Sequence, residues 1–279
     1  MNSGNNHNVF NKIAVINDMT GFGRCALAVE LPIISHMGIQ CCPVPTSIFS
    51  NHTAYESFYF QDYTEHMEAY TAEWKKLGLL FDGILTGFYG SARQIDMVEQ
   101  FIKDFSNEDT IVIVDPIMGD NGETYATYNV QMCEKMKELA RMADIITPNL
   151  TELCLLVGES YVEGYDYDFI KGMCDRLAQS LKKNCKIVVT GIKRGNYLVN
   201  YIYCNGEVET VQNECAGDTR CGTGDVFAAI IAADAVRGVG LKDSVKRAAD
   251  FVSECIQVSD KYQIPKTDGV CFEKLLYKL

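Results

Sequence analysis

The chain of 279 residues has a formal net charge of −12, and 47% of its residues are hydrophobic. Such an acidic chain does not offer the long basic track that nucleic acid or an anionic membrane requires, so we expect small molecules or proteins as partners. No run of about 18 apolar residues occurs, and residues 1–10 are rich in asparagine and lack the pattern of a signal peptide. We therefore expect a soluble, cytoplasmic protein with a disordered tail over residues 1–10.

Twelve cysteines are scattered along the chain. A chain of this length buries a large core without disulfides, and the absence of an export signal argues against an oxidising compartment. No Cys-x-x-Cys pair occurs and the four histidines lie far apart, so the spacing does not indicate a structural zinc site. We predict twelve reduced thiols.

Short apolar runs rich in β-branched residues alternate with segments of helical periodicity. The apolar runs are typical of buried parallel strands and cover Lys12–Ile16, Gly83–Thr86, Thr110–Val114, Asp144–Thr147 and Lys186–Thr190. The predicted helices cover Cys25–Met37, Ser91–Phe105, Asn129–Met142, Thr151–Val157 and Asp168–Lys183. This alternation predicts an α/β fold with helices on both faces of a mostly parallel sheet.

Two stretches depart from this alternation. Residues 39–63 contain Pro43, Pro45 and many aromatic residues, fit neither a helix nor a regular strand, and are predicted to form a flap over a site. Residues 197–204 and 207–211 alternate across Asn205-Gly206, which is the strongest short signal for a hairpin. The sheet is therefore expected to gain an antiparallel edge, and the lack of a linker predicts a single domain over residues 11–279.

A glycine-rich turn opens the most apolar of the predicted helices. Gly222-Thr223-Gly224-Asp225 precedes residues 226–236, which are rich in alanine and isoleucine and typical of a fully buried helix. The unpaired N–H groups at a helix start, and the positive end of the helix dipole, favour an anion. An aspartate there is ordinarily explained by the dipole alone. Beside a phosphoryl group, the same carboxylate is also well placed to take a proton from an attacking hydroxyl.

A second polar set follows two predicted strands. Asp115 and Asp120 come after Ile-Val-Ile-Val, and Asn149 and Glu152 follow Asp-Ile-Ile-Thr-Pro. In open α/β sheets ligands bind outside the carboxyl ends of the strands, where oxygen ligands hold hydrated magnesium and ATP phosphates. The alternative is structural, because a proline ends each strand and Asn or Glu then caps the next helix. The pattern leaves both interpretations open.

Residues 21–26, Gly-Phe-Gly-Arg-Cys-Ala, match the dinucleotide-binding fingerprint and follow a strand. Asp18 to Thr20 separate the predicted strand from the glycines, however, and residues 39–47 offer no acid for a ribose. We therefore interpret the match as accidental. No P-loop motif occurs either.

Three motifs in this order resemble those of the ribokinase superfamily: Val-Asp115-Pro-Ile-Met-Gly-Asp120, Thr147-Pro-Asn149-Leu-Thr-Glu152 and Gly222-Thr-Gly-Asp225. Phe49-Ser-Asn-His52-Thr53 and Leu85-Thr-Gly-Phe88-Tyr-Gly-Ser91 are similar to the vitamin B6 kinases within it. The resemblance covers nearly the whole chain. It implies a ribokinase-like three-layer α/β/α kinase domain, a homodimer, ATP with Mg²⁺, and phosphorylation of the 5′-hydroxymethyl group of pyridoxal, pyridoxine or pyridoxamine.

The resemblance also implies roles for individual residues. Asp225 would be the base, with an anion hole made by the amides of Gly222, Thr223 and Gly224. The ATP side would be lined by Asp115, Asp120, Thr147, Asn149, Thr190 and Thr223, and magnesium would be organised by Asn149 and Glu152. The substrate pocket would contain Asn17, His52, Thr53 and Phe88, although a histidine in an aromatic stretch is more often simply packed.

This sequence departs from the vitamin B6 kinases at two positions in the substrate pocket. Asn17-Asp18 stands where Ser-His is common, and the following Met-Thr-Gly-Phe-Gly resembles the hydroxymethylpyrimidine kinases of thiamine synthesis. Phe88 keeps a ring for stacking but lacks the hydroxyl of the usual tyrosine. Against the pyrimidine kinases, that branch often has a cysteine at the position of Asp225.

Three functions therefore remain open. A vitamin B6 kinase comes first, a hydroxymethylpyrimidine (phosphate) kinase second, and a catalytically silent nucleotide-binding regulatory protein third. The sequence does not choose a vitamer or establish a need for a monovalent cation such as K⁺. It also does not choose the residue that contacts the phosphates among Lys193, Arg194 and Arg220.

Overall fold

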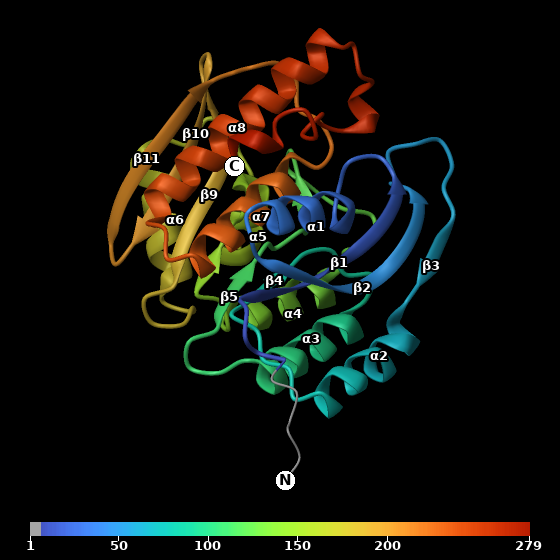
Figure 1. The fold of residues 1–279 in the computed structure, drawn as a ribbon. Helices are drawn as coiled ribbons and strands as arrows, with labels where there is room; N and C mark the ends of the chain where they lie inside the picture. Colours follow the sequence, from blue (N-terminus) through green and yellow to red (C-terminus); the bar gives the residue numbers. More distant parts are fainter. Residues whose placement is uncertain (1–6) are drawn as a thin grey trace.

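A nine-stranded sheet separates two layers of helices (Figure 1). The computed structural model describes residues 7–279. The strands of this sheet are β1 (Lys12–Phe22), β2 (Gln40–Asn51), β3 (Phe60–Asp62), β4 (Gly83–Thr86), β5 (Ile111–Val114), β8 (Ile145–Ile146), β9 (Lys186–Arg194), β10 (Tyr197–Cys204) and β11 (Glu207–Glu214). A separate small sheet pairs β6 (Gly119–Asp120) with β7 (Glu123–Thr124).

The strand order of the large sheet is β11-β10-β9-β8-β5-β4-β1-β2-β3. The neighbours from β9 to β2 in this order pair in parallel. At the two edges, β3, β10 and β11 pair antiparallel to their neighbours. These pairings confirm the predicted α/β class with a mostly parallel sheet and an antiparallel edge hairpin.

Helices cover both faces of the sheet (Figure 1). One face packs against α1 (Leu27–His36), α7 (Thr223–Val236) and α8 (Leu241–Lys261). The other packs against α2 (Thr64–Lys76), α3 (Ala92–Phe105), α4 (Val130–Ala140), α5 (Leu150–Val157) and α6 (Tyr167–Ala178). Two short 3-10 turns, Lys266–Asp268 and Leu276–Lys278, follow α8.

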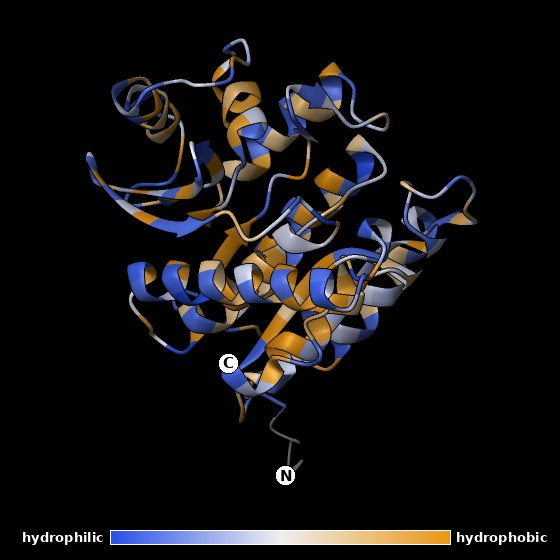
Figure 2. Cartoon of the chain, turned by 90° about the horizontal axis from the view of Figure 1, so that it is seen from above, coloured by the Kyte–Doolittle hydropathy of each residue, from blue (hydrophilic) through white to orange (hydrophobic). Residues whose placement is uncertain are grey.

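Both faces of β1 are apolar, as a central parallel strand requires. Ile13 and Val15 point into the core under α1, α7 and α8, whereas Ala14 and Ile16 point into the opposite core. Figure 2 shows the apolar residues on the central strands and on the helix faces that cover them. The apolar runs recognised in the sequence are therefore the buried strands at the centre of the molecule.

The expectation that residues 39–63 avoid a regular strand is wrong, because β2 occupies twelve of them. β1 pairs with one edge of β2 along its length, whereas β3 pairs with the other edge only at Ser47–Phe49. At its prolines, β2 therefore has a strand partner on one edge only. The Pro43 carbonyl, on the open side, accepts the Tyr70 hydroxyl at 2.9 Å. A proline is tolerated at such an unpaired edge, because no neighbouring strand there needs the N–H group that proline lacks.

The first strand is longer than its apolar run predicts. β1 continues with an irregularity between Asn17 and Met19 and stays paired with β2 as far as Phe22. Residues 18–20 therefore continue the strand and do not separate it from the glycines. The strand persists because polar residues beyond Ile16 find hydrogen-bond partners inside the protein.

Several smaller expectations are tested by the structure. Asn205 and Gly206 have positive φ angles of 51° and 88°, as a tight hairpin turn requires. All twelve cysteines are free thiols, as predicted. No helix within residues 7–279 has the length and hydropathy that a membrane crossing needs. Residues 1–6 of the expected tail lie outside the described part of the chain, and the Asn8 side chain contacts Gly78 and Leu80.

Candidate active site

The glycine turn lies at the amino end of α7, where Gly222 is the N-cap residue. Gly222 has a φ angle of 78°, and a Cβ atom there would lie 1.8 Å from the Arg24 carbonyl oxygen. Only glycine fits this approach between two backbone segments. The turn is thereby fixed against the chain that enters α1.

The turn presents backbone donors on its open side. No side chain among the described residues caps α7. Gly224 is exposed, and a Cβ atom placed on it would meet nothing within 4 Å. Because the first N–H groups of a helix lack intrahelical partners, Gly222, Thr223 and Gly224 offer a cradle for an anion. The use of these amides as an anion cradle stays a prediction, and the Gly222 amide also contacts the Cys221 thiol.

Asp225 lies directly behind this cradle. Its carboxylate accepts the Ala26 backbone N–H and lies 3.5 Å from the Asn17 amide nitrogen. Ala26 is the N-cap residue of α1 and has a φ angle of 50°, which an alanine rarely adopts. Burial raises the pKa of Asp225 to about 6, although these hydrogen bonds lower it in part. The carboxylate is therefore ionised at neutral pH and able to accept a proton.

Asn17 connects three parts of the site. Its amide oxygen accepts the backbone N–H groups of Asp18 and Phe88, each at 2.9 Å. Its amide nitrogen lies 3.0 Å from a Glu30 carboxylate oxygen and 3.5 Å from Asp225. Sequence reasoning missed Glu30, whose only signal was an acid in the middle of an otherwise apolar helical segment.

Phe88 lies at the carboxyl end of β4, next to Asn17. Its carbonyl oxygen accepts the Thr46 hydroxyl at 2.9 Å, and its half-buried ring meets the Phe49 ring edge-on with centroids 6.1 Å apart. The structure therefore places Asn17 and Phe88 together beside Asp225. Of the other predicted substrate residues, Thr53 is exposed.

His52 is buried and packs against the segment that precedes the turn. One ring nitrogen lies 2.5 Å from the Thr267 carbonyl oxygen, and the other accepts the Ala54 N–H at 3.3 Å. His52 also contacts the Cys221 thiol, which in turn contacts Cys25. These contacts lower the pKa of Cys221. No pattern in the sequence indicated this pair of thiols beside the turn.

Two of the three candidate phosphate-binding cations are bound away from the turn. Arg220 is buried, and its guanidinium binds Asp260 at 2.6 Å and the Ile264 carbonyl at 2.8 Å. Arg194 donates to the Tyr165 carbonyl, and Lys193 is exposed on β9. Arg220 therefore holds the segment after α8 in place.

Asp115 and Thr147 meet at the carboxyl ends of β5 and β8. The Thr147 hydroxyl donates to Asp115 at 2.9 Å, and both residues are buried. Burial first, and then the charge of Asp225, raises the pKa of the Asp115 carboxyl. Two acids that disfavour each other's ionisation are a suitable place for a cation or a metal-bound phosphate.

Asn149 and Glu152 form a capping box at the start of α5. Asn149 accepts the Glu152 N–H at 2.9 Å, and Glu152 accepts the Asn149 N–H at 2.8 Å. The other Glu152 oxygen accepts the Met118 N–H at 3.2 Å. The structure thus contains the helix cap that the sequence allowed as an alternative. No cluster of three or more metal-binding side chains occurs in residues 7–279. Each carboxylate oxygen still has a free lone pair, so the residues fit a hydrated ion.

The remaining predicted ATP residues lie around this cap. Thr190, in the middle of β9, donates its N–H to the Pro148 carbonyl at 2.9 Å and forms a β-bridge with Asn149. Asp120 is exposed on β6, where its carboxylate accepts the backbone and side-chain N–H groups of Asn121. The structure therefore connects Asp115 with Thr147, and Asn149 with Thr190, whereas Asp120 lies on the separate small sheet.

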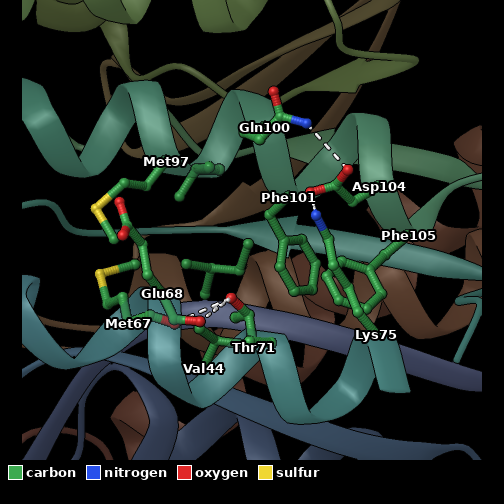
Figure 3. A pocket seen from close by; sticks show the side chains of 13 residues that line it. Val44, Met67, Glu68, Thr71, Lys75, Met97, Gln100, Phe101, Asp104 and Phe105 are labelled. Atoms are coloured by element: carbon green, nitrogen blue, oxygen red, sulfur yellow. Dashed lines mark hydrogen bonds and ion pairs between the residues drawn. The ribbon is translucent and has the colours of Figure 1, made fainter. Parts of the chain in front are cut away.

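A pocket of about 220 Å³ lies elsewhere, between α2 and α3 (Figure 3). Met67, Met97 and Phe101 line it, and an ion pair between Lys75 and Asp104 lies beside them. None of its lining residues belongs to the candidate site. We therefore assign no substrate to this pocket.

Comparison with known proteins decides the family. Residues 30–271 match the model of the phosphomethylpyrimidine kinase family. The chain belongs to this family. The match confirms the resemblance to the ribokinase superfamily, and it makes the chain an ATP-dependent phosphotransferase.

Relatives of this phosphomethylpyrimidine kinase family member bear two kinds of name. A hydroxymethylpyrimidine/phosphomethylpyrimidine kinase of Aquifex aeolicus is 27% identical and covers 64% of this chain and 68% of its own. A pyridoxal kinase of Lactobacillus plantarum is 26% identical, with a TM-score of 0.90 over 96% of this chain and 95% of its own.

A third relative is a putative phosphomethylpyrimidine kinase of Bacteroides thetaiotaomicron crystallised with pyridoxal. It is 36% identical, with a TM-score of 0.90 over 96% of this chain and 95% of its own. The family thus spans kinases of vitamin B6 and of hydroxymethylpyrimidine.

Proposed function

We propose that this kinase transfers the γ-phosphoryl group of ATP to the 5′-hydroxymethyl group of a vitamin B6 vitamer. The observation that carries the proposal is the position of Asp225, whose raised pKa and open amide cradle suit a base beside a migrating phosphoryl group. The pyridoxal in the crystal of the Bacteroides relative supports the choice of a pyridine substrate.

In the proposed reaction, Asp225 accepts the proton of the substrate hydroxyl as its oxygen attacks the γ-phosphorus in line. The amides of Gly222, Thr223 and Gly224 stabilise the charge on the phosphoryl oxygens. Because these donors are fixed by the packing of Gly222 against Arg24, they need no reorganisation during the reaction.

The ATP side of the site is proposed at the carboxyl ends of β5, β8 and β9. Its residues are Asp115, Asp120, Thr147, Asn149, Thr190 and Thr223. Magnesium, when bound with ATP, would neutralise the negative charge of the phosphates. We propose that Asn149 and Glu152 hold it through water, because their oxygens already cap α5. A monovalent cation such as K⁺ remains a further proposal.

The substrate side is proposed between β1, β4 and the loop after β2. Phe88 would stack on the pyridine ring, and Asn17 would lie near the reacting hydroxyl because it contacts both Phe88 and Asp225. His52 and Thr53 complete the proposed pocket, with His52 held by Thr267.

A hydroxymethylpyrimidine kinase is the second candidate. The motif that follows Asn17 and the Aquifex relative both favour it. The aspartate at position 225 argues for the vitamin B6 branch.

Turnover with separate substrates tests the choice. ATP consumption and product mass should be measured with pyridoxal, pyridoxine, pyridoxamine and hydroxymethylpyrimidine in turn. We expect at least one B6 vitamer to give a kcat/KM at least tenfold above that of the pyrimidine. A preference for the pyrimidine would reverse the assignment, and no turnover with any of the four would favour a silent nucleotide-binding protein.

We further propose a homodimer in the cytoplasm, on the resemblance to vitamin B6 kinases. Sedimentation analysis should then give twice the chain mass of 31.1 kDa.

A further inference from the structure

Glu30 is an acid buried where its neighbours in the helix are apolar. It lies on α1 with 1% of its surface exposed, and the other buried residues of this helix are Leu27, Val29, Ile33 and Ile34. Burying a carboxyl group costs several kcal/mol unless a specific interaction offsets the cost. Its hydrogen-bond partner is the Asn17 amide nitrogen, at 3.0 Å.

The Asn17 side chain has only one orientation that satisfies its surroundings. Its oxygen accepts two backbone N–H groups, so the NH₂ group must face Glu30 and Asp225. The packing is tight, because a Cβ atom at Gly87 would lie 2.3 Å from the Asn17 side chain. One amide nitrogen therefore bridges two carboxyl groups, with one hydrogen for each.

We propose that Glu30 is a positioning residue that acts through Asn17 to hold the Asp225 carboxylate in its orientation for proton transfer. The inference rests on the proposed function in taking Asp225 as the base. It adds a residue that neither contacts the phosphate cradle nor belongs to a motif.

A second buried acid, Asp234, provides a comparison for Glu30 because its charge has a structural role. Asp234, on α7, is fully buried and forms ion pairs with Arg237 and Arg247. Within residues 7–279, Glu30 has no such ion pair. The charge of Asp234 is thus compensated by cations, whereas Glu30 faces an amide shared with the candidate base.

Glu30 is buried among acids that disfavour its ionisation. The titratable groups that face Asp225 are Asp18, Cys25, Glu30, Asp115, Tyr125 and Cys221. Burial, followed by the charge of Asp225, raises the pKa of Glu30 well above its ordinary value. In this geometry Glu30 is the hydrogen-bond acceptor for the Asn17 NH₂ group.

Two substitutions separate this role from simple packing. Glu30→Gln keeps an oxygen that accepts the Asn17 hydrogen, whereas Glu30→Leu keeps the volume but removes the acceptor. We expect Glu30→Leu to lower kcat about 10-fold to 100-fold with little change in the KM for ATP, since misplacing a reacting group by about 1 Å costs up to 10²-fold. Glu30→Gln should stay within about threefold of the wild type.

A titration that does not depend on turnover keeps the proposal testable if the proposed function fails. The Asp225 carboxyl is followed by ¹³C NMR in the protein without substrate and assigned with Asp225→Asn. Glu30→Leu should raise the pKa of Asp225 above about 6, because the Asn17 NH₂ group loses one of the two acceptors that position it and its hydrogen bond to the Asp225 carboxylate weakens, and Glu30→Gln should not. Asp234→Asn, the matched buried acid, should leave the Asp225 pKa unchanged.

Clear outcomes would overturn the proposal. An unchanged Asp225 pKa in folded Glu30→Leu is one, and a loss of kcat that Glu30→Gln shares in full is another. If Glu30→Leu does not fold, Asn17→Ser breaks the same link with Glu30 intact, and an unchanged Asp225 pKa in that variant also overturns it. The substrate panel on the wild-type enzyme tests the proposed function separately.

Discussion

Several buried carboxyl groups surround the amino end of α7. Burial raises the pKa of Asp18 to about 7 and that of Asp225 to about 6, and it also raises the pKa of Asp115. The motif around Asp225 made this site predictable at the residue scale. The acid at position 30 was not predictable, because nothing in a linear sequence indicates which buried side chain faces Asn17.

The raised pKa of Asp18 predicts a dependence of stability on pH. Asp18 binds its proton more tightly in the folded than in the unfolded chain, so its contribution is complete below the unfolded pKa near 4 and is lost as pH rises through about 7. Asp18→Asn should therefore become more stable relative to the wild type between pH 5 and 8, by up to about 3 kcal/mol. Denaturant unfolding at four pH values measures this difference.

Asp218→Asn is the control, because Asp218 is exposed and Lys266 lowers its pKa. Its difference from the wild type should stay constant between pH 5 and 8. A constant difference for Asp18→Asn as well would contradict the raised pKa of Asp18.

At the element scale, the start of α5 has two interpretations that both survive in the structure. The capping box is local in sequence and was therefore predictable. The length of β2 was not, because its prolines are tolerated only where the short β3 leaves the edge of β2 unpaired. The length of an element that depends on contacts with distant segments cannot be predicted from local sequence pattern.

A pair of cap variants separates capping from magnesium binding. Asn149→Ala and Asn129→Ala each remove an N-cap side chain, at the starts of α5 and α4. Both should lower the free energy of unfolding by about 1 kcal/mol. Only Asn149→Ala should also raise the KM for MgATP, by tenfold or more, in steady-state kinetics. Equal KM values in the two variants would mean that Asn149 caps α5 and does not contribute to MgATP binding.

At the scale of the whole molecule, the alternation of strands and helices was enough to predict the layers, and the hairpin signal at Asn205-Gly206 predicted the antiparallel edge. Ligands of open α/β sheets bind where parallel strands end, and Asp115 and Thr147 meet at the ends of β5 and β8. That the ATP site lies there stays a prediction. The strand order and the thiol pair beside the turn depend on contacts between distant segments, which local periodicity does not encode. The extent of the tail and the single domain over residues 11–279 remain predictions.

The central claim is that the turn from Gly222 to Asp225 is the phosphoryl-transfer centre and that Asp225 is its base. A single-turnover rate measured with Asp225→Asn, together with the Kd for ATP, tests it most directly. We predict a fall of about 10² to 10⁴ in the rate, with ATP affinity within about threefold of the wild type because the cradle amides remain. A variant that transfers phosphate at nearly the wild-type rate would contradict the account.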